Sequence, residues 1–383
     1  MKPKVLLSAS LFHALNDAAS VVVPMTLPLL YSQKYLITRY AQIGLLSNLG
    51  LMTTLVFQTL VAHYADRFEY RRILVWSCLG LTASLALITT ARSFLLLLAF
   101  HLLMRVFNSF YHPLGIALVS RAYPCGDIDR AMGVQSGSGN LGVFLAFLTS
   151  GFLTQALGWR APLLAWAGLG VLLGALSYLA VRRLPRGEVS LKQPRASTWL
   201  ETAALIKDFI PGFVYGGAGW GVTIYFAPSL FHHKFGLTLG QTGIILALWI
   251  GLGTVVTYGF GRLSRSLGRR NLSLLSMFGS ALCLAILGTA SSSGPALAAL
   301  LLFGGFLFLI YPAMQSYVGN RVPESRQALA FSLVSNIQVL AGAIVALVSG
   351  FLSDRFGIHT PFLMMAAVGV LLAIYYWRQA PRA

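Results

Sequence analysis

Apolar runs of about 20 residues recur along the whole chain, and short segments rich in arginine and lysine separate them. A membrane-spanning helix needs about 20 apolar residues and tolerates glycine and proline. The pattern therefore predicts an all-α polytopic membrane protein with twelve spans, at approximately residues 7–31, 40–65, 71–91, 94–122, 130–154, 160–182, 203–230, 239–262, 270–290, 295–320, 327–352 and 359–378. The longest stretch without a span, residues 184–202, is the predicted cytoplasmic linker between an N-terminal bundle (1–183) and a C-terminal bundle (203–383).

Composition supports a membrane protein. Hydrophobic residues make up 57% of the 383 residues, charged residues make up 10%, and the mean hydropathy is +0.74. A soluble chain carries about 25% charged residues, which it needs to cover a surface in contact with water. The net charge of +18 does not indicate nucleic-acid binding, because the basic residues flank the apolar runs instead of forming a basic domain. The three cysteines predict no disulfide framework.

The basic residues also predict the orientation of the chain. With the N-terminus inside, 21 lysines and arginines lie in inner loops and ends and only six lie in outer loops, at Lys34, Arg39, Arg92, Arg160, Lys234 and Arg355. Lys and Arg are enriched on the cytoplasmic side of membrane proteins. Both termini are therefore predicted to be cytoplasmic, and the first apolar run is interpreted as the first membrane helix instead of a cleaved signal.

The two halves of the chain resemble each other at an offset of 199 residues. This shift aligns Gln42 with Gln241, Pro113 with Pro312, and the segment 150–162 with the segment 349–361. A repeat of six spans is typical of transporters with two bundles and a substrate path between them. The sequence thus predicts two six-helix bundles related by pseudo-two-fold symmetry.

Ionisable residues interrupt two of the predicted spans. Asp17 lies roughly 15 Å into the first span and Arg105 roughly 16 Å into the fourth, so both are predicted near the middle of the membrane and are candidate counter-charges. Polar neighbours share a helix face with each of them: His13 and Asn16 with Asp17, and His101, Asn108 and His112 with Arg105. A charge at the bilayer centre costs at least ~2.5–3.5 kcal/mol, so these faces must meet each other or water.

Three interpretations of Asp17 and Arg105 stay open. The two residues could form a buried ion pair that only holds two helices in register. Asp17 could instead be the proton-coupling carboxylate, with Arg105 and His13 as partners that adjust its charge. Arg105 could also bind an anionic substrate, since a guanidinium pairs with carboxylate or phosphate through two parallel hydrogen bonds. Ionisable groups inside spans mark ion and substrate paths, which favours a transport role.

Further candidates for substrate contact are polar and aromatic residues within the spans. They are Asn16, His101, Asn108, His112, Gln135 and Asn140 in the N-terminal half, and Tyr215, Trp249, Tyr311, Gln315 and Asn336 in the C-terminal half. The C-terminal half has glycines, Gly216 and Gly304, where the repeat aligns Asp17 and Arg105, so proton coupling is predicted in the N-terminal half. Neither an H-x-x-x-H nor a C-x-x-C spacing occurs, so no metal site is predicted.

The whole chain resembles the major facilitator superfamily. The loop between the second and third spans reads AHYADRFEYRR, similar to the family's G-x-L-A-D-R-x-G-R-R motif, and its repeat reads GRLSRSLGRR. The resemblance implies a latch at the inner face, formed by Asp66, Arg67, Arg71 and Arg72 with Arg265, Arg269 and Arg270 in the second half. The alternative interpretation is that these are only orientation charges.

A closer resemblance is to the fosmidomycin-resistance branch of that superfamily. The chain is similar to this branch at His13, Asn16 and Asp17 in the first span, at Phe110 to Pro113 late in the fourth, and at Gln135 to Gly142 in the fifth. The resemblance implies a proton-driven exporter of small toxic compounds in the cytoplasmic membrane of a bacterium.

The predicted function is therefore secondary active transport by alternating access: a small organic solute, anionic if Arg105 binds it, is exported in exchange for protons. The alternative is proton- or sodium-coupled uptake of an anionic metabolite, and a more remote one is a non-transporting membrane sensor or scaffold. The motif G-x-x-x-x-G-K-[ST] is absent, so ATP is not the expected driver, and no enzymatic activity is predicted. The expected partners are the solute and the lipid bilayer, with no nucleic acid and no cofactor beyond the ion gradient, for a monomer.

Overall fold

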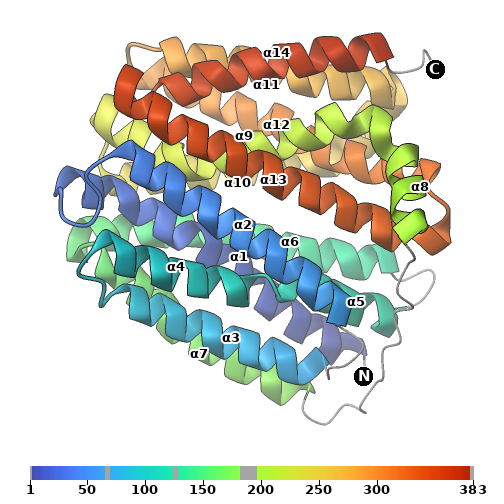
Figure 1. The fold of residues 1–383 in the computed structure, drawn as a ribbon, viewed down its shortest axis with the longest axis horizontal. Helices are drawn as coiled ribbons and strands as arrows, with labels where there is room; N and C mark the ends of the chain where they lie inside the picture. The colour runs from blue at the N-terminus through green and yellow to red at the C-terminus, as the bar shows by residue number, and fades with distance from the viewer. Residues whose placement is uncertain (1, 65–69, 124–127, 182–195, 380–383) are drawn as a thin grey trace. The chain divides into compact units, whose positions relative to one another are not determined.

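The computed structural model describes residues 2–64, 70–123, 128–181 and 196–379, and its described elements are helices (Figure 1). Ten helices are long and apolar enough to cross a membrane, and two further helices complete the twelve predicted spans: α3, which has a shorter apolar stretch at Arg72–Ile88, and α9. The first half comprises α1 (Lys2–Ser32), α2 (Tyr40–Tyr64), α3 (Tyr70–Ile88), α4 (Phe94–Asn108), α5 (Tyr111–Ala122), α6 (Ile128–Leu157) and α7 (Arg160–Val181).

The second half begins with α8 (Ala196–Ile206) and a short 3₁₀ turn, η2 (Lys207–Phe209). It continues with α9 (Ile210–Ser229), the π-helical turn η3 (Leu230–Lys234), α10 (Leu239–Leu267), α11 (Arg269–Thr289), α12 (Ser293–Arg321), α13 (Glu324–Phe356) and α14 (Thr360–Gln379). The twelve-helix, two-bundle fold with both termini in the cytoplasm is confirmed.

Two predicted boundaries differ from the structure. The predicted span 94–122 is divided into α4 and α5 at Ser109 and Phe110, where the Phe110 amide donates to the Phe107 carbonyl, three residues back, and Pro113 has no N–H to donate to the Ser109 carbonyl. Residues 196–202 of the predicted linker belong to α8, a separate short helix that packs against α12 and α13. The turn at Lys207–Phe209 separates α8 from α9, where one continuous span was predicted from residue 203.

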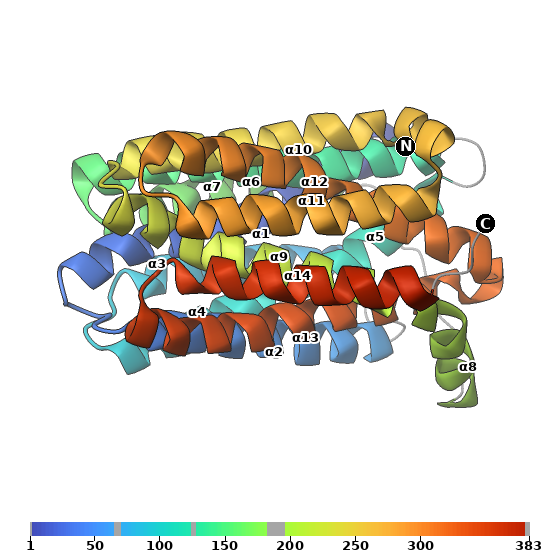
Figure 2. The same cartoon turned by 90° about the horizontal axis from the view of Figure 1, so that it is seen from above.

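Contacts between Cα atoms divide the chain into two units. The first contains residues 1–38, 49–192 and 238–247, and the second contains residues 39–48, 193–237 and 248–383. In the first unit α1 is the central helix and contacts α5, α6 and α7. In the second unit α9 packs against α13 and α14, and α14 runs beside α11 in both views (Figures 1 and 2). The outer ends of α2 and α10 are thus each grouped with helices of the other half of the chain.

Equivalent hydrogen bonds hold the outer ends of α2 and α10. In the second unit, the Asp354 carboxylate accepts from the backbone amides of Tyr40 and Ala41 at 2.7 and 3.0 Å, at the start of α2. In the first unit, Gln155 Oε1 accepts from the Gly240 amide at 2.9 Å, at the start of α10. Gln155 and Asp354 correspond at the offset of 199 residues, as do Ala41 and Gly240. The sequence repeat is therefore also a repeat of contacts.

We expect Asp354→Ala to loosen the start of α2. The first amides of a helix lack partners within the helix, and losing a capping acceptor costs about 1 kcal/mol. Hydrogen exchange of peptides covering residues 38–46 should become faster in this variant. Arg355→Ala, which changes the neighbouring exposed charge, is the control and should leave exchange unchanged. Equal exchange in Asp354→Ala and the parent chain would show that the carboxylate does not hold α2.

Candidate functional site

Three residues of α1 place a carboxylate beside an imidazole inside the first unit. His13 and Asp17 are four residues apart, so their side chains lie on one face one turn apart. His13 Nε2 is 3.0 Å from Asp17 Oδ2. Asn16 Nδ2 donates to Asp17 Oδ1 at 3.3 Å. The predicted association of His13, Asn16 and Asp17 follows from this local helical spacing.

A second imidazole reaches the same carboxylate from α5. His112 Nε2 lies 3.4 Å from Asp17 Oδ1, so each carboxylate oxygen has one histidine next to it. The rings of His13 and His112 are perpendicular, with centroids 5.3 Å apart. We call His13, Asp17 and His112 the His–Asp–His cluster. His112 was predicted as a substrate contact, and its position against Asp17 is a finding of the structure.

Neighbouring side chains fix the orientation of the His13 ring. His13 Nδ1 lies 2.8 Å from the Gln135 carbonyl oxygen of α6, and the ring of Tyr111 stacks on it at 4.7 Å. The Tyr111 hydroxyl donates to the Ala9 carbonyl at 2.8 Å and accepts from Gln135 Nε2 at 2.9 Å. Gln135 was predicted to contact the substrate. Here it is buried and supports the His13 ring instead.

The Gln135 carbonyl determines which nitrogen of His13 carries a proton. A carbonyl oxygen can only accept, so Nδ1 must donate its N–H to it. In a neutral His13, Nε2 would then be an unprotonated acceptor facing a carboxylate oxygen, and two acceptors at 3.0 Å repel each other. A proton between Nε2 and Oδ2 removes this conflict. The geometry of the cluster therefore requires a bound proton, or another cation, at this contact.

Gly139 of α6 makes room for the His–Asp–His cluster. A Cβ atom at this position would lie 2.6 Å from Asp17 Oδ2 and 2.7 Å from His13 Cε1. Any larger residue would have to displace the ion pair. Gly139 lies in the QSGSGN stretch that the sequence analysis singled out for its resemblance to an exporter family. Gly139 is therefore a site residue that the sequence analysis missed.

Access to solvent increases across the cluster. The side chain of His13 is 8% exposed, that of Asp17 is 23% exposed and that of His112 is 43% exposed. His112 is therefore the member most open to water or to a solute, and His13 is the most enclosed.

Arg105 does not occupy the predicted place against Asp17. Its Nε donates to the Gly50 carbonyl of α2 at 3.3 Å, and the ion pairs of Asp17 among the described residues are with the two histidines. The reason is depth: Asn108, one turn beyond Arg105, donates to the Asn16 carbonyl at 2.7 Å. Asp17 therefore faces the level of His112, and the predicted pairing of Asp17 with Arg105 is wrong for this structure.

Arg105 lies in a second buried polar group with His101. The side chain of His101 is fully buried one turn before Arg105 on α4. Gly50 of α2 packs closely on both, since a Cβ at Gly50 would lie 2.7 Å from His101 Nε2 and 3.2 Å from Arg105 Cγ. The predicted stripe of His101, Arg105, Asn108 and His112 thus divides, with the first two residues facing α2 and the last two facing α1.

The sequence matches one family model over most of its length. Residues 7–346, and again residues 260–383, match the model described as Major Facilitator Superfamily. The chain belongs to the major facilitator superfamily. Its members are transporters, so the superfamily assignment makes the protein a multi-pass transporter of the cytoplasmic membrane and excludes an enzyme.

Two curated relatives are named as an efflux pump and as a multidrug resistance protein. The chain is 24% identical over 326 residues to the purine ribonucleoside efflux pump NepI of Salmonella paratyphi C, covering 84% of this chain and 80% of NepI. It is 27% identical over 187 residues to the multidrug resistance protein MdtG of Proteus mirabilis, covering 46% of this chain and 44% of MdtG. The match to MdtG thus spans less than half of that relative.

A solved superfamily structure shares the fold. The crystal structure of a bacterial homolog of the human lysosomal transporter Spinster, in an inward-facing and unoccupied conformation, superposes with a TM-score of 0.84. The two sequences are 16% identical, and the match covers 99% of this chain and 96% of that chain. At this identity the likeness concerns the fold.

The superfamily motif residues lie partly outside the described residues. Asp66, Arg67 and the side chain of Arg71 lie outside the described residues. The latch that these residues were predicted to form therefore remains a prediction. Arg72 is exposed at the start of α3. In the repeat loop, Arg265 Nε donates to the Gly261 carbonyl at 3.1 Å, and Arg270 Nη2 donates to the Trp377 carbonyl at 2.8 Å. Arg269 is exposed at the start of α11.

The candidates in the second unit are mostly packed within it. Tyr215 and Trp249 are fully buried, and Trp249 lies in a group of aromatic rings with Trp220, Phe303 and Phe308. These two predicted substrate contacts are therefore buried packing residues here. The Tyr311 hydroxyl donates to the Gly216 carbonyl at 3.1 Å. The remaining candidates are Gln315, which is exposed, and Asn336 and, in the first unit, Asn140, which are part-buried.

The His–Asp–His cluster also has donors suited to a metal ion. The ligand atoms of its three residues all lie within 4.8 Å of one another, and imidazole with carboxylate suits transition metals. The sequence predicted no metal site, because the donors of this cluster do not lie close together along the chain. His112 lies 99 residues after His13 (112 − 13), so only the fold brings these donors together.

Proposed function

We propose that this transporter exports a small organic solute in exchange for protons, and that the His–Asp–His cluster binds the coupling proton. The single observation that carries the proposal is the 3.0 Å contact between His13 Nε2 and Asp17 Oδ2, with His13 Nδ1 already donating to the Gln135 carbonyl. This contact needs a proton to be favourable. The efflux activity in the name of NepI supports the outward direction, and the drug resistance in the name of MdtG agrees with it.

The arrangement suggests how proton and solute binding are linked. With the proton present, Asp17 and His13 attract each other and the cluster is closed. When the proton leaves through the more exposed His112, Asp17 and a neutral His13 repel each other, so the face of α1 near α5 and α6 becomes a different binding surface. A solute that binds only one of these two states exchanges for the proton, which is the thermodynamic requirement of antiport.

The names of the relatives suggest candidate solutes. NepI is named for purine ribonucleosides, so the ribonucleosides are the first class to test. Arg105 favours an anionic solute, because a buried guanidinium attracts carboxylate or phosphate groups. In the first unit we propose Arg105, Asn108 and His112 as solute contacts, with Asn16, His101 and Asn140 as further candidates. In the second unit we retain Tyr311, Gln315 and Asn336.

Flux into proteoliposomes under imposed gradients tests the proposal. We expect solute to accumulate in vesicles with an acidic lumen, because protons that leave the lumen drive the solute in. In the cell the same exchange runs in the other direction: protons enter and the solute leaves. A gradient that is alkaline inside should drive uptake if the protein is instead a symporter for an anionic metabolite. A sodium gradient without a pH gradient tests the alternative coupling ion. Flux that does not respond to any gradient would contradict secondary active transport.

A chelator separates the proton from a metal ion at the His–Asp–His cluster. The same flux is measured after EDTA treatment and dialysis of the protein. We propose that proton-driven flux persists, since the proposal needs only the proton. Loss of flux that returns when Zn²⁺ is added would contradict the assignment of this site to the proton alone.

Arg105→Ala should weaken the binding of anionic solutes by about tenfold or more, because a charge-assisted, two-pronged contact is lost. Neutral solutes of similar size should bind as in the parent chain. Arg105→Lys keeps the charge but loses the planar fork, so it should recover part of the affinity. Equilibrium binding to the purified protein measures this, and Arg160→Ala, at the outer end, is the control. Unchanged anion affinity in Arg105→Ala would refute the assignment.

A further inference from the structure

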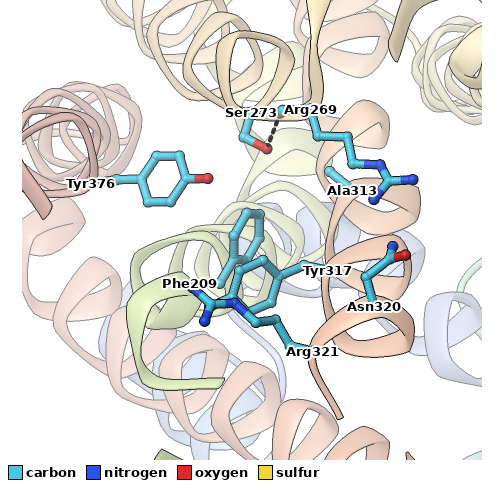
Figure 3. Close-up of a pocket in the computed structure, with 8 residues that line it drawn as sticks. All are labelled: Phe209, Arg269, Ser273, Ala313, Tyr317, Asn320, Arg321 and Tyr376. Carbon is cyan, nitrogen blue, oxygen red and sulfur yellow. Dashed lines mark hydrogen bonds between the residues drawn. The ribbon is translucent and has the colours of Figure 1, made fainter. Parts of the chain in front are cut away.

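A cavity of about 240 Å³ lies between the turn η2 and the inner ends of α11, α12 and α14, entirely within the second unit. Figure 3 shows Arg269, Asn320 and Arg321 extending from two helices around this space, with the rings of Phe209, Tyr317 and Tyr376 beside it. The residues of the His–Asp–His cluster belong to the first unit. The cavity therefore needs an explanation that does not involve the proposed proton site.

The side chains that line the cavity bring two positive charges to it. Arg321 Nη2 lies 3.3 Å from Asp208 Oδ2, and its guanidinium faces the ring of Tyr317 at 5.6 Å. Arg269 is exposed and has no ion pair with another described residue. Two guanidinium groups thus line the cavity, and the Asp208 carboxylate pairs with one of them. A guanidinium has five N–H donors, so Arg321 can hold Asp208 and still donate to a further anion.

The surroundings of the cavity are also basic. The inner ends of the second unit carry eight arginines and lysines against three acidic residues; these are Lys207, Arg262, Arg265, Arg269, Arg270, Arg321, Arg326 and Arg378, against Glu201, Asp208 and Glu324. Where the family motif has an aspartate, this loop has Arg265. The excess of positive charge attracts anions to this end of the protein.

The start of α11 adds a further positive contribution. The 21-residue helix begins at Arg269, and the preceding Gly268 has no side chain with which to cap its first amides. The N-terminal end of a helix carries a partial positive charge, and its free N–H groups bind phosphate. Together with the two arginines, this end supplies the donors that a phosphate group needs.

Exposed aromatic residues place the cavity at the level of the lipid headgroups. Tyr375 and Trp377, the neighbours of Tyr376 on α14, are 51% and 57% exposed. Tyrosine and tryptophan are enriched at the interface between membrane and water. Arg270 Nη2 donates to the Trp377 carbonyl at 2.8 Å, which joins this aromatic segment to the start of α11. A ligand in the cavity would thus come from the inner membrane surface.

We propose that this cavity binds the phosphate group of an anionic phospholipid from the inner leaflet. The phosphate lies between Arg269 and Arg321, near the first amides of α11, and Asn320 can donate to a headgroup oxygen. The rings of Tyr317 and Tyr376 contact the apolar part of the headgroup region. Basic pockets between membrane helices on the cytoplasmic side are suited to such headgroups. This proposal is independent of the direction and the coupling of transport.

Native mass spectrometry of the full chain tests this lipid site. The protein is purified in detergent and incubated with equal amounts of phosphatidylglycerol and phosphatidylcholine. We expect the parent chain to retain phosphatidylglycerol, and Arg269→Ala to require about tenfold more of it for the same occupancy. Arg265→Ala removes an equal charge outside the cavity and is the matched control. Arg269→Lys, which keeps a positive charge, should recover part of the binding if the variant chain is folded.

The outcomes separate a lipid from a free anion. Retention of phosphatidylglycerol that is equal in Arg269→Ala and the parent chain would overturn the proposal, as would an equal loss in Arg265→Ala. A competition arm adds inorganic phosphate at rising concentration. Phosphatidylglycerol that remains bound at millimolar phosphate supports a lipid site. Displacement of the lipid by phosphate at equal concentration would show a site for free phosphate and overturn the lipid assignment.

Discussion

Asp17→Asn is expected to abolish the response of solute flux to a pH gradient. The asparagine side chain has the same shape as aspartate but cannot carry the negative charge that holds a proton against His13 Nε2. Accumulation driven by an imposed gradient should therefore fall to the level of vesicles without protein. Exchange of labelled for unlabelled solute, which needs no net proton movement, should persist, because the fold and the solute contacts remain.

The comparison of these two fluxes makes the Asp17 test specific. A variant that is merely misfolded would lose both exchange and gradient-driven flux, whereas a coupling variant loses only the second. Asp354→Asn removes a carboxylate at the outer end of α13 and is the matched control, with gradient-driven flux expected to persist. If Asp17→Asn accumulates solute under the gradient as well as the parent chain does, the proton is coupled elsewhere and the proposed mechanism fails.

Gly142→Ala is expected to lower the stability of the protein strongly. A Cβ atom at Gly142 of α6 would lie 2.1 Å from the Ala14 carbonyl oxygen of α1 and 2.7 Å from its Cα. These are backbone atoms of a buried helix, so they cannot rotate away, and the two helices must separate. Overpacking of this kind costs about 1–3 kcal/mol or more. The separation would also move Gln135 away from His13, so coupling should weaken together with stability.

Thermal unfolding in detergent and gradient-driven flux measure the two consequences of Gly142→Ala. Gly133→Ala is a matched control on the same helix, because a Cβ there meets no atom within 4 Å. The control should unfold at the temperature of the parent chain or slightly higher, since alanine favours helix over glycine. An unfolding temperature of Gly142→Ala equal to that of the parent would mean that α1 and α6 do not pack as closely as the structure shows.

Several features of this site are readable from local sequence spacing. His13 and Asp17 lie four residues apart in a helix, so their contact follows from helical periodicity alone. The repeat at 199 residues correctly pairs Gln155 with Asp354, which make equivalent contacts with the starts of α10 and α2. Periodicity and repeats act over short or regular distances, and that is why the sequence reveals them.

Other features of the site depend on how helices meet. The partner of Asp17 on the fourth predicted span is His112 and not Arg105, although both lie on the predicted polar stripe. Depth counted from estimated span ends carries an error of a few residues, and one helical turn is enough to exchange one partner for the other.

The sequence by itself determined the membrane class, the twelve spans, the orientation and the presence of a carboxylate within the first span, because hydropathy, charge bias and helical period are properties of single segments. Only the tertiary structure decided that Asp17 lies between two histidines, that Gly139 gives them room, and that Arg269 and Arg321 share a cavity. The physical reason is that each of these contacts joins residues from different helices. Close packing of helix against helix, which no single segment encodes, selects which side chains meet.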